Sequence, residues 1–317
     1  MAFTATISIS TWAKGLIAAK RRRMTDIVPP KRVFSPAREE AEVASQSASA
    51  PQTEHDAYRL AFQDLDFLLR EDLRPVRFQL ELLKPELLLD EAGIASTFVI
   101  YGSARIPEPS KADAIVAAAA TDHQRLIAER LKAKAKYYDE ARALARLASR
   151  VGRDADGKRH FVVCSGGGPS VMEAANRGAA DEGAESIGLN IVLPHEQLPN
   201  AYVTPELSFR FHYFALRKMH FLLRARAVAV FPGGYGTFDE AFELLTLIQT
   251  GKVKPMPILF FGRDFWERVI DFEALVEEGV IAPDDLDLFK FVETAAEAWA
   301  HVCDHYAEGE ASPTGRE

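Results

Sequence analysis

The sequence repeats one unit that strongly limits the fold: a short apolar run, then a turn, then a helical pattern. The apolar runs lie within residues 96–101, 160–165, 186–194, 227–231, 255–262 and 289–292. The helical patterns between them lie at about residues 110–150, 169–183, 211–226, 237–252 and 264–279. Apolar strands of about four to eight residues that alternate with helices form a parallel sheet covered on both faces. We therefore predict an α/β fold, a Rossmann-like doubly wound parallel sheet.

The N-terminal part of the chain differs from this repeat. Residues 1–53 read as a disordered tail and linker, first basic and acid-free, then small and polar. The basic cluster follows the apolar residues, which is the reverse of a secretory signal, although an organellar transit peptide stays open. Residues 54–95 are predicted to be a helical extension in which Pro85 marks a break or a restart. Residues 96–308 hold the repeat, and residues 309–317 form a tail.

The charge balance and the cysteines exclude several kinds of partner. Lys and Arg number 38 against 46 Asp and Glu, a net charge of −8, so we expect no nucleic acid and no membrane as partner. No apolar run approaches the ~20 residues that span a bilayer. The two cysteines, Cys164 and Cys303, lack metal-ligand spacing and indicate a reducing compartment without disulfides. We therefore expect a cytoplasmic protein without a metal site, with Cys164 in its core.

Glycine-bearing turns follow three of the predicted strands. They contain Gly102 and Ser103; Gly166, Gly167 and Gly168; and Gly233, Gly234, Gly236 and Thr237. In a doubly wound sheet such turns lie at the ligand-binding edge, where free N–H groups and helix dipoles favour a phosphate. One such turn alone is best explained as a tight strand–helix connection, but three at one edge favour a phosphate-bearing ligand. The spacings of dinucleotide-binding and P-loop motifs are absent, so we expect no cofactor of the NAD type.

Two of these segments carry a family resemblance. The segments "SGGGPSVMEAANRGA" (165–179) and "PGGYGTFDE" (232–240) resemble the LOG, or lonely guy, family, whose hallmark is P-G-G-x-G-T-x-x-E. The likeness covers roughly residues 97–293. It implies a nucleotide-binding catalytic domain that cleaves the N-glycosidic bond of a nucleoside 5′-monophosphate, either AMP or a cytokinin riboside monophosphate. The products are the free base and ribose 5-phosphate. The resemblance also implies a homodimer or a larger homo-oligomer, and we expect no cofactor.

The resemblance also assigns roles to residues. An Arg of an Arg-Lys pair and the Glu that closes the hallmark are catalytic in the family, and they match Arg217 and Glu240. The glycine turns, with Thr237 and Lys218, are then expected to bind the substrate. Three departures from the family pattern leave the base preference open. The first motif reads G-G-G-P-S-V-M-E where compact members have G-G-G-x-x-G-L-M-G, a long insert precedes the second strand, and the helical extension is present.

The proposed catalytic residues suit the chemistry, and each also has a simpler explanation. Cleavage of a ribosyl C–N bond passes through a cation-like state, which a fixed anion near the sugar stabilises. We expect Glu240, near a helix start, to stay ionised; the alternative is that Thr237-x-x-Glu240 is only a capping box. Arg217 and Lys218 lie on an otherwise apolar helix, so they need a partner such as a phosphate or the leaving base. The simpler explanation of this basic pair is a solvated helix face.

Several other positions have weaker assignments. The proton donor to the leaving base is open, with three candidates by residue type alone, each also explained by a structural role: His195, His212 and His220. Met172 and Glu173 are candidates to line the base pocket, and a helix interior explains them equally well. Arg105, just after the first glycine turn, is a candidate second phosphate clamp.

Two rival functions stay open at this point. A non-catalytic nucleotide-binding regulator of the same fold would use the glycine turns without breaking a bond. The older family label, lysine decarboxylase, would require a lysine that forms a Schiff base with pyridoxal phosphate. No lysine has a persuasive setting for that role, and Lys218 beside an arginine is a poor candidate.

Overall fold

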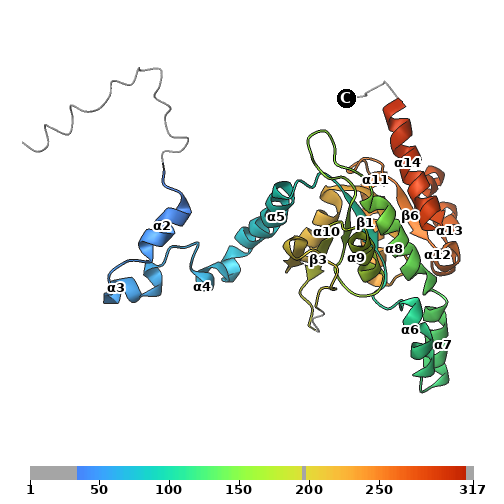
Figure 1. The fold of residues 1–317 in the computed structure, drawn as a ribbon, viewed down its shortest axis with the longest axis horizontal. Coiled ribbons are helices and arrows are strands. Elements are labelled where there is room, and N and C mark those ends of the chain that lie inside the picture. The colour runs from blue at the N-terminus through green and yellow to red at the C-terminus, as the bar shows by residue number, and fades with distance from the viewer. Residues whose placement is uncertain (1–33, 195–197, 312–317) are drawn as a thin grey trace, which may run out of the picture. The chain divides into compact units, whose positions relative to one another are not determined.

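The computed structural model describes residues 34–194 and 198–311 and divides the chain into two compact units, Met1–Leu73 and Arg74–Glu317 (Figure 1). The described part of the first unit holds only short helices, none of which buries a residue: α2 (Ala37–Ala44), α3 (Pro51–Glu54), η2 (Asp56–Tyr58), α4 (Leu65–Leu68) and η3 (Glu71–Leu73). The described residues of the predicted tail and linker (1–53) thus contain α2 and most of α3, without a core. Residues 1–33 of the predicted tail and linker (1–53) and residues 312–317 of the predicted C-terminal tail (309–317) lie outside the described residues, while residues 309–311 belong to the last helix.

The second unit is built around a seven-stranded sheet in which all neighbouring strands are parallel. The strands are β1 (Thr97–Tyr101), β2 (Val162–Ser165), β3 (Ile187–Ile191), β4 (Ser208–Phe211), β5 (Ala225–Val230), β6 (Ile258–Phe261) and β7 (Lys290–Val292). Their order is β4-β3-β2-β1-β5-β6-β7, so the chain winds outward in opposite directions from the neighbours β1 and β5. The predicted Rossmann-like doubly wound sheet is confirmed.

The sequence pattern misses the edge strand β4. This strand pairs with β3 through Leu189 and Phe209, and the described part of the connection between them holds only the 3-10 helix η4 (Pro205–Leu207). Its sequence, Ser-Phe-Arg-Phe, buries alternate residues only. Interior parallel strands are apolar throughout because helices cover both faces, whereas this edge strand exposes one face and therefore lacks the continuous apolar run.

Apolar side chains alternate between the two faces of the sheet, as strand geometry requires. In β1, Phe98 and Ile100 belong to one buried cluster and Val99 and Tyr101 to the other. The first cluster packs against α8 (Lys136–Ser149), α9 (Val171–Asp181) and α14 (Ala295–Ala311). The second packs against α5 (Arg74–Glu91), α10 (Phe214–Leu223), α11 (Tyr235–Gln249), α12 (Arg263–Val269) and α13 (Phe272–Glu277). Cys164 lies in this second cluster, so its predicted place in the core is confirmed.

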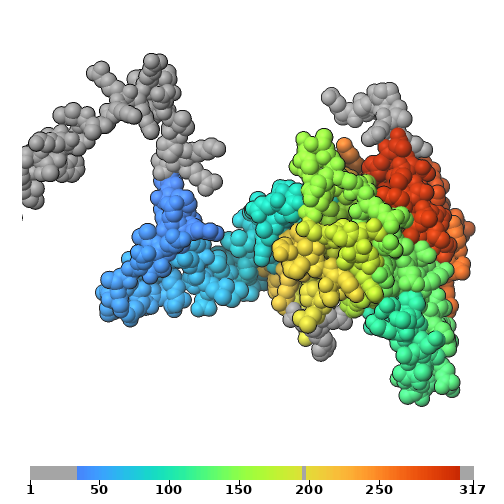
Figure 2. Space-filling view, viewed as in Figure 1, coloured from blue at the N-terminus to red at the C-terminus, as the bar shows by residue number. Residues whose placement is uncertain are grey.

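Several helices differ in extent from the predicted ones. The stretch at 110–150 forms three helices, α6 (Pro109–Ala117), α7 (Asp122–Lys132) and α8, and the α6–α7 pair projects from the body of the domain (Figures 1 and 2). The stretch at 264–279 forms α12 and α13, because the Asp271 carboxylate accepts the N–H of Ala274 (3.0 Å) and starts a new helix. Within the described residues, no helix is both long and apolar enough to cross a membrane.

Helix α5 contradicts the prediction that Pro85 breaks or restarts a helix. The helix runs without interruption from Arg74 to Glu91, with Pro85 buried inside it. Proline has no N–H, so the carbonyl four residues earlier, that of Glu81, loses its helical partner. The Nε2 atom of His220 lies 3.1 Å from this carbonyl oxygen. A side chain of α10 thus replaces the missing backbone donor, and α5 continues.

Candidate active site

The candidate site lies where the winding direction of the sheet reverses. Gly102 directly follows β1 and Pro232 follows β5, the two neighbouring strands from which the chain winds outward. The two turns are tied together, because the N–H of Ser103 donates to the carbonyl of Pro232 (3.1 Å). Ligands of doubly wound sheets bind at this kind of crevice, outside the carboxyl ends of the strands. Two of the three predicted glycine turns therefore meet at the expected edge.

The start of α11 offers backbone donors at this crevice. The first helical hydrogen bond runs from the N–H of Phe238 to the carbonyl of Gly234 (3.0 Å), so the N–H groups of Tyr235, Gly236 and Thr237 precede the helical ladder. A side chain added at Gly234 or Gly236 would meet no protein atom within 4 Å, so both positions face open space. A helix N-terminus with free N–H groups and open space in front of it suits a phosphate.

The third glycine turn, after β2, lies against Arg217. A Cβ atom at Gly166 would come within 2.7 Å of Arg217 Nη2, so only glycine lets the guanidinium approach this closely. Gly167 has a φ of +70°, and its N–H donates to Ser165 Oγ (3.0 Å). A Cβ atom at Gly168 would touch the Met172 side chain, which therefore lies beside the turn. The turn brings the predicted phosphate loop and the predicted catalytic arginine together.

Arg217 and Glu240 form an ion pair that is almost fully withdrawn from solvent. Arg217 Nη1 lies 3.2 Å from Glu240 Oε1, and the two side chains are only 12% and 13% exposed. Arg217 Nε also donates to the carbonyl of Leu189 in the middle of β3 (2.7 Å), and the guanidinium lies 5.0 Å from the ring centre of Phe221. The structure thus joins two side chains that are far apart in the sequence, on α10 and α11.

Comparisons with known proteins match the part of the chain that contains this pair. A family model described as "Possible lysine decarboxylase" matches residues 172–302. Cytokinin riboside 5′-monophosphate phosphoribohydrolase LOG3 of Arabidopsis thaliana is 27% identical over 140 residues, which cover 43% of this chain and 63% of that protein. The probable cytokinin riboside 5′-monophosphate phosphoribohydrolase LOGL3 of Oryza sativa subsp. japonica is 27% identical over 144 residues, covering 43% and 64%. The matched segment, less than half of the chain, is therefore similar to LOG phosphoribohydrolases.

The likeness to these LOG relatives is partial. The chain spans 63% and 64% of the length of the two curated relatives. The solved structure of the Moco carrier protein from Chlamydomonas reinhardtii is 17% identical, with a TM-score of 0.40, over 67% of this chain and 98% of that one. That structural likeness is weak, and the fold assignment rests on the strand order of the sheet itself.

Burial changes the expected charge of Glu240. Burial raises the pKa of Glu240 from its ordinary 4.5 to about 7, although the Arg217 guanidinium opposes the shift. The prediction that the helix dipole keeps Glu240 fully ionised is therefore wrong, because with a pKa of about 7 the carboxyl group is only partly ionised near neutral pH. The loss of hydration outweighs the helix dipole, which falls off within the first turn of a helix. A carboxyl group with a pKa near 7 is suited to acid–base chemistry at neutral pH.

The capping-box explanation of Glu240 is also wrong. Helix α11 begins at Tyr235 with Gly234 as its N-cap, so Thr237 lies within the first turn and Glu240 well inside the helix. A capping box requires the Thr at the N-cap and the Glu at the third helical position. The carboxylate of Glu240 reaches Arg217 instead of the backbone of Thr237.

Lys218 contacts acids of α11. Its ammonium group lies 3.0 Å from Asp239 and 3.1 Å from Glu243. Burial lowers the pKa of Lys218, but its hydrogen bonds to these two carboxylates outweigh burial and leave the pKa above its ordinary value. Lys218 therefore braces α10 against α11, and its predicted contact with the substrate stays a prediction.

A buried polar network that sequence reasoning missed supports the glycine turn after β2. Asn176 Oδ1 accepts hydrogen bonds from Ser165 Oγ (2.7 Å) and Asn200 Nδ2 (2.9 Å). The backbone N–H of Asn200 donates to the carbonyl of Gly167 (2.8 Å), and its side-chain amide donates to that of Gly168 (3.0 Å). Asn176 is fully buried, and an asparagine among the small residues of "MEAANRGA" was the signal that could have revealed it.

The weaker candidates have structural partners. His195 lies outside the described residues. The backbone N–H of His212 donates to Glu81 (3.0 Å), and His220 is buried beside the carbonyl of the same glutamate. Glu173 accepts a hydrogen bond from Tyr138 (3.0 Å). The backbone N–H of Arg105 bonds Ser103 Oγ (3.0 Å). None of these contacts involves Arg217 or Glu240.

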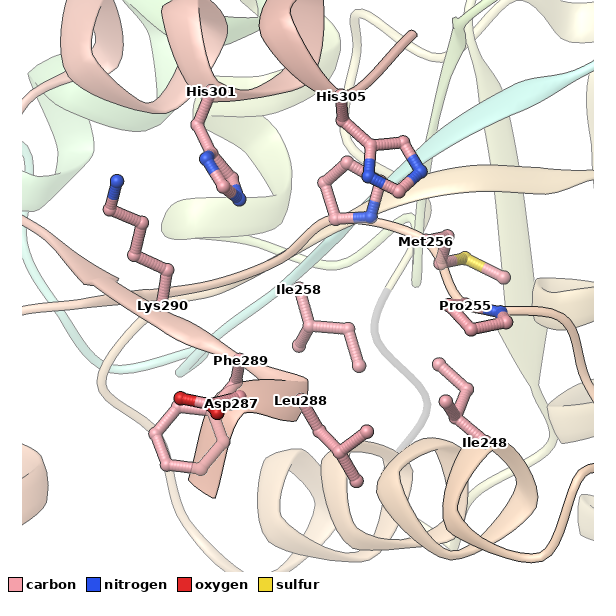
Figure 3. Close-up of a pocket in the computed structure, with 11 residues that line it drawn as sticks. Ile248, Pro255, Met256, Ile258, Asp287, Leu288, Phe289, Lys290, His301 and His305 are labelled. Atoms are coloured by element: carbon pink, nitrogen blue, oxygen red, sulfur yellow. The ribbon is translucent and has the colours of Figure 1, made fainter. Parts of the chain in front are cut away.

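A separate hollow lies at the opposite end of the strands, where the strands begin. It has a volume of about 390 Å³ and is lined at the starts of β6 and β7 by residues such as Pro257, Ile258 and Lys290. His301 and His305 extend into it from α14 (Figure 3). The amino ends of parallel strands form the edge opposite to their carboxyl ends, so this hollow is distinct from the crevice that holds the glycine turns.

Burial of Glu240 predicts a specific dependence of stability on pH. A carboxyl group whose pKa is raised on folding stabilises the fold at low pH, and this contribution is lost as the pH rises from 4.5 through about 7. Between pH 5 and pH 8, the free energy of unfolding should therefore fall by up to about 3 kcal/mol more in the wild-type protein than in Glu240→Gln. Urea unfolding at the two pH values measures this difference.

The matched control is Asp239→Asn, which removes the neighbouring carboxylate, 58% exposed. It should retain most of the wild-type difference between pH 5 and pH 8, because the Asp239 carboxylate raises the pKa of Glu240 less than burial does. An equal pH dependence in wild type and Glu240→Gln would contradict the raised pKa of Glu240.

Proposed function

We propose that the chain is a hydrolase that cleaves the N-glycosidic bond of nucleoside 5′-monophosphates, of the AMP or cytokinin riboside monophosphate type. The products would be the free base and ribose 5-phosphate. The observation that carries the proposal is the buried Arg217–Glu240 pair beside the glycine turns and the free N–H groups at the start of α11. The names of the two LOG relatives, both phosphoribohydrolases, support the same reaction class.

In this proposal the start of α11 binds the phosphate. The N–H groups of Tyr235, Gly236 and Thr237 and the helix dipole would hold the phosphate oxygens. The open space at Gly234 and Gly236 admits the group, since a Cβ atom at either position would meet no protein atom within 4 Å. A phosphate held there would bring the ribose toward Glu240, which lies further along the same helix. The glycine turn after β2 and Met172 would border the other side.

Glu240 and Arg217 would serve the bond cleavage itself. The C1′–N bond breaks with its electron pair leaving on the base, and a water oxygen bonds to C1′. One water proton is released and one proton reaches the base. The ionised carboxylate of Glu240 would stabilise the positive charge that develops on the ribose and orient the water. Arg217 would hold that carboxylate in place through the 3.2 Å contact, since its Nε atom is fixed by the carbonyl of Leu189.

Two other functions fit the site less well. A nucleotide-binding regulator would need the glycine turns, but it gives no reason to bury an arginine and a glutamate beside them. A pyridoxal-dependent decarboxylase needs a lysine that readily loses its proton. The pKa of Lys218, where hydrogen bonds to Asp239 and Glu243 outweigh burial, lies above its ordinary value. The hydrolase therefore fits the observed contacts best.

The phosphate assignment predicts that the 5′-phosphate is required for turnover. AMP should release adenine, whereas adenosine should barely react, because it lacks the group that the start of α11 would bind. Chromatography of the bases released from a panel of nucleoside monophosphates, and from the matching nucleosides, measures this. The panel should include a cytokinin riboside monophosphate to reveal the base preference. Comparable rates with AMP and adenosine would contradict the phosphate assignment. Tight AMP binding without base release would favour the nucleotide-binding regulator.

We also propose that the protein is a cytoplasmic homodimer or a larger homo-oligomer. The support is a hollow of about 920 Å³ beside α10 and α11. One part of its lining is apolar, and charged residues such as Arg226 and Glu243 also line it; the apolar residues include Met219, Leu222, Leu223, Leu247 and Val253. Met219 and Leu223 are 45% and 41% exposed, and contiguous apolar surface of this kind is typical of an interface. The candidate active site would then lie close to a neighbouring copy of the chain, since Arg217 is also on α10.

Light scattering should give the mass of a dimer or a larger assembly at micromolar concentration. Leu223→Glu should yield monomers, because it places a charge among the apolar side chains of this hollow. Ile115→Glu, at a similarly exposed position on α6, should assemble as the wild type does. A monomeric mass for the wild-type protein would contradict the proposed assembly.

A further inference from the structure

Glu81 of α5 holds the start of α10, the helix that carries Arg217. Its carboxylate oxygens accept the backbone N–H groups of His212 (3.0 Å) and Tyr213 (3.2 Å), the two residues just before α10. The carbonyl of Tyr213 in turn accepts the N–H of Arg217 (3.1 Å), the start of the helical ladder. A single residue thus lies between the Glu81 carboxylate and the backbone of Arg217. A carboxylate at this end of a helix is also favoured by the helix dipole.

Glu81 contacts the same helix a second time through its backbone. Its carbonyl has no helical partner because Pro85 lacks an N–H, and it faces His220 Nε2 at 3.1 Å. A carbonyl only accepts, so His220 carries its proton on Nε2. His220 is buried and lies one turn after Arg217 on α10. The side chain and the carbonyl of Glu81 therefore contact α10 on both sides of Arg217.

Helix α5 also holds the far end of α10. Arg224, the residue that ends the helix, lies 2.8 Å from Glu86 and 2.9 Å from Asp90. Near the other end, the rings of Phe78 and Tyr213 pack with their centres 4.1 Å apart. Helix α5 therefore holds α10 at its start, at His220 and at its end.

We propose that Glu81 is a positioning residue that keeps the Arg217 guanidinium in contact with Glu240. The inference rests on the proposed function of that pair and adds a role for α5, which belongs to the helical extension before the first strand. Arg217 must satisfy the Leu189 carbonyl and Glu240 together, at 2.7 and 3.2 Å. A shift of about 1 Å in such a group costs a large part of the catalytic rate.

The titration of Glu240 reports the position of Arg217 without any substrate. Burial raises the pKa of Glu240 and the guanidinium of Arg217 opposes that rise, so withdrawal of Arg217 should raise the pKa further. The other charged or titratable groups that face this carboxylate are Lys218 on α10, Asp239 and Glu243 on α11, Tyr101 on β1 and Cys164 on β2. Only Lys218 would move with α10, and its withdrawal acts in the same direction as that of Arg217.

The experiment compares Glu81→Ala and Glu81→Gln with Leu89→Ala in the full chain. Leu89 is a buried residue of the same helix, 4% exposed, so its truncation lowers the melting temperature without removing the contacts of Glu81. Three quantities are measured: the melting temperature, kcat and KM for base release from AMP, and the titration midpoint of Glu240. Carbon-13 NMR of labelled glutamate gives the midpoint, and the signal lost in Glu240→Gln assigns it.

Glu81→Ala should raise the Glu240 midpoint and lower kcat on the order of tenfold or more, with a smaller change in KM. Glu81→Gln should lie between it and the wild type, because its amide oxygen still accepts one of the two N–H groups. Leu89→Ala should lower the melting temperature and leave the midpoint unchanged.

An unchanged Glu240 midpoint in folded Glu81→Ala, or in Glu81→Gln if the alanine variant does not fold, would overturn the positioning role. A midpoint that moves in a protein whose wild type releases no base would support the positioning role and reject the proposed function. If the wild type releases base but Glu81→Ala changes neither the Glu240 midpoint nor kcat, the proposed function would be supported and the positioning role rejected.

Discussion

The Arg217–Glu240 ion pair is the constraint on which the rest of the site depends. Both side chains are almost completely removed from water, and burial of two charges is costly unless their geometry and remaining hydrogen bonds are good. Arg217 meets that condition through the carbonyl of Leu189 and the ring of Phe221. Glu240 meets it only in part, because burial leaves its pKa near 7. A pKa shifted in this way is common among residues of functional sites.

The topology of the sheet explains how this pair comes to lie beside a helix start suited to a phosphate. The carboxyl ends of β1 and β5 meet where the winding reverses, and the turns that follow them are joined by the Ser103–Pro232 hydrogen bond. The strand β3 supplies the Leu189 carbonyl, and α10 and α11 approach closely enough for Lys218 to bridge them. The polar network around Asn176 then fixes the third turn. Each contact is short in space and distant in sequence.

The fold could be predicted from local sequence patterns, and the two residues of the buried pair were singled out by the resemblance to the LOG family. Apolar runs mark interior strands because such strands are buried on both faces, and the hallmark around Gly233 pointed to Glu240. The failures come from non-local effects. The edge strand β4 exposes one face, and His220 replaces the donor that the Glu81 carbonyl loses at Pro85. The pKa of Glu240 depends on burial by elements far along the chain. No local pattern carries information about such partners.

The most direct test of the proposed catalytic pair is the turnover of Glu240→Gln with a nucleoside monophosphate that the wild type hydrolyses. Glutamine keeps the size of the side chain and a hydrogen-bonding oxygen for Arg217, but it removes the negative charge. We predict a loss in kcat on the order of a hundredfold or more in a protein that remains folded by circular dichroism. Asp239→Asn, at the more exposed neighbouring position, should retain most of the activity. Near wild-type turnover by folded Glu240→Gln would contradict the catalytic role of the buried pair.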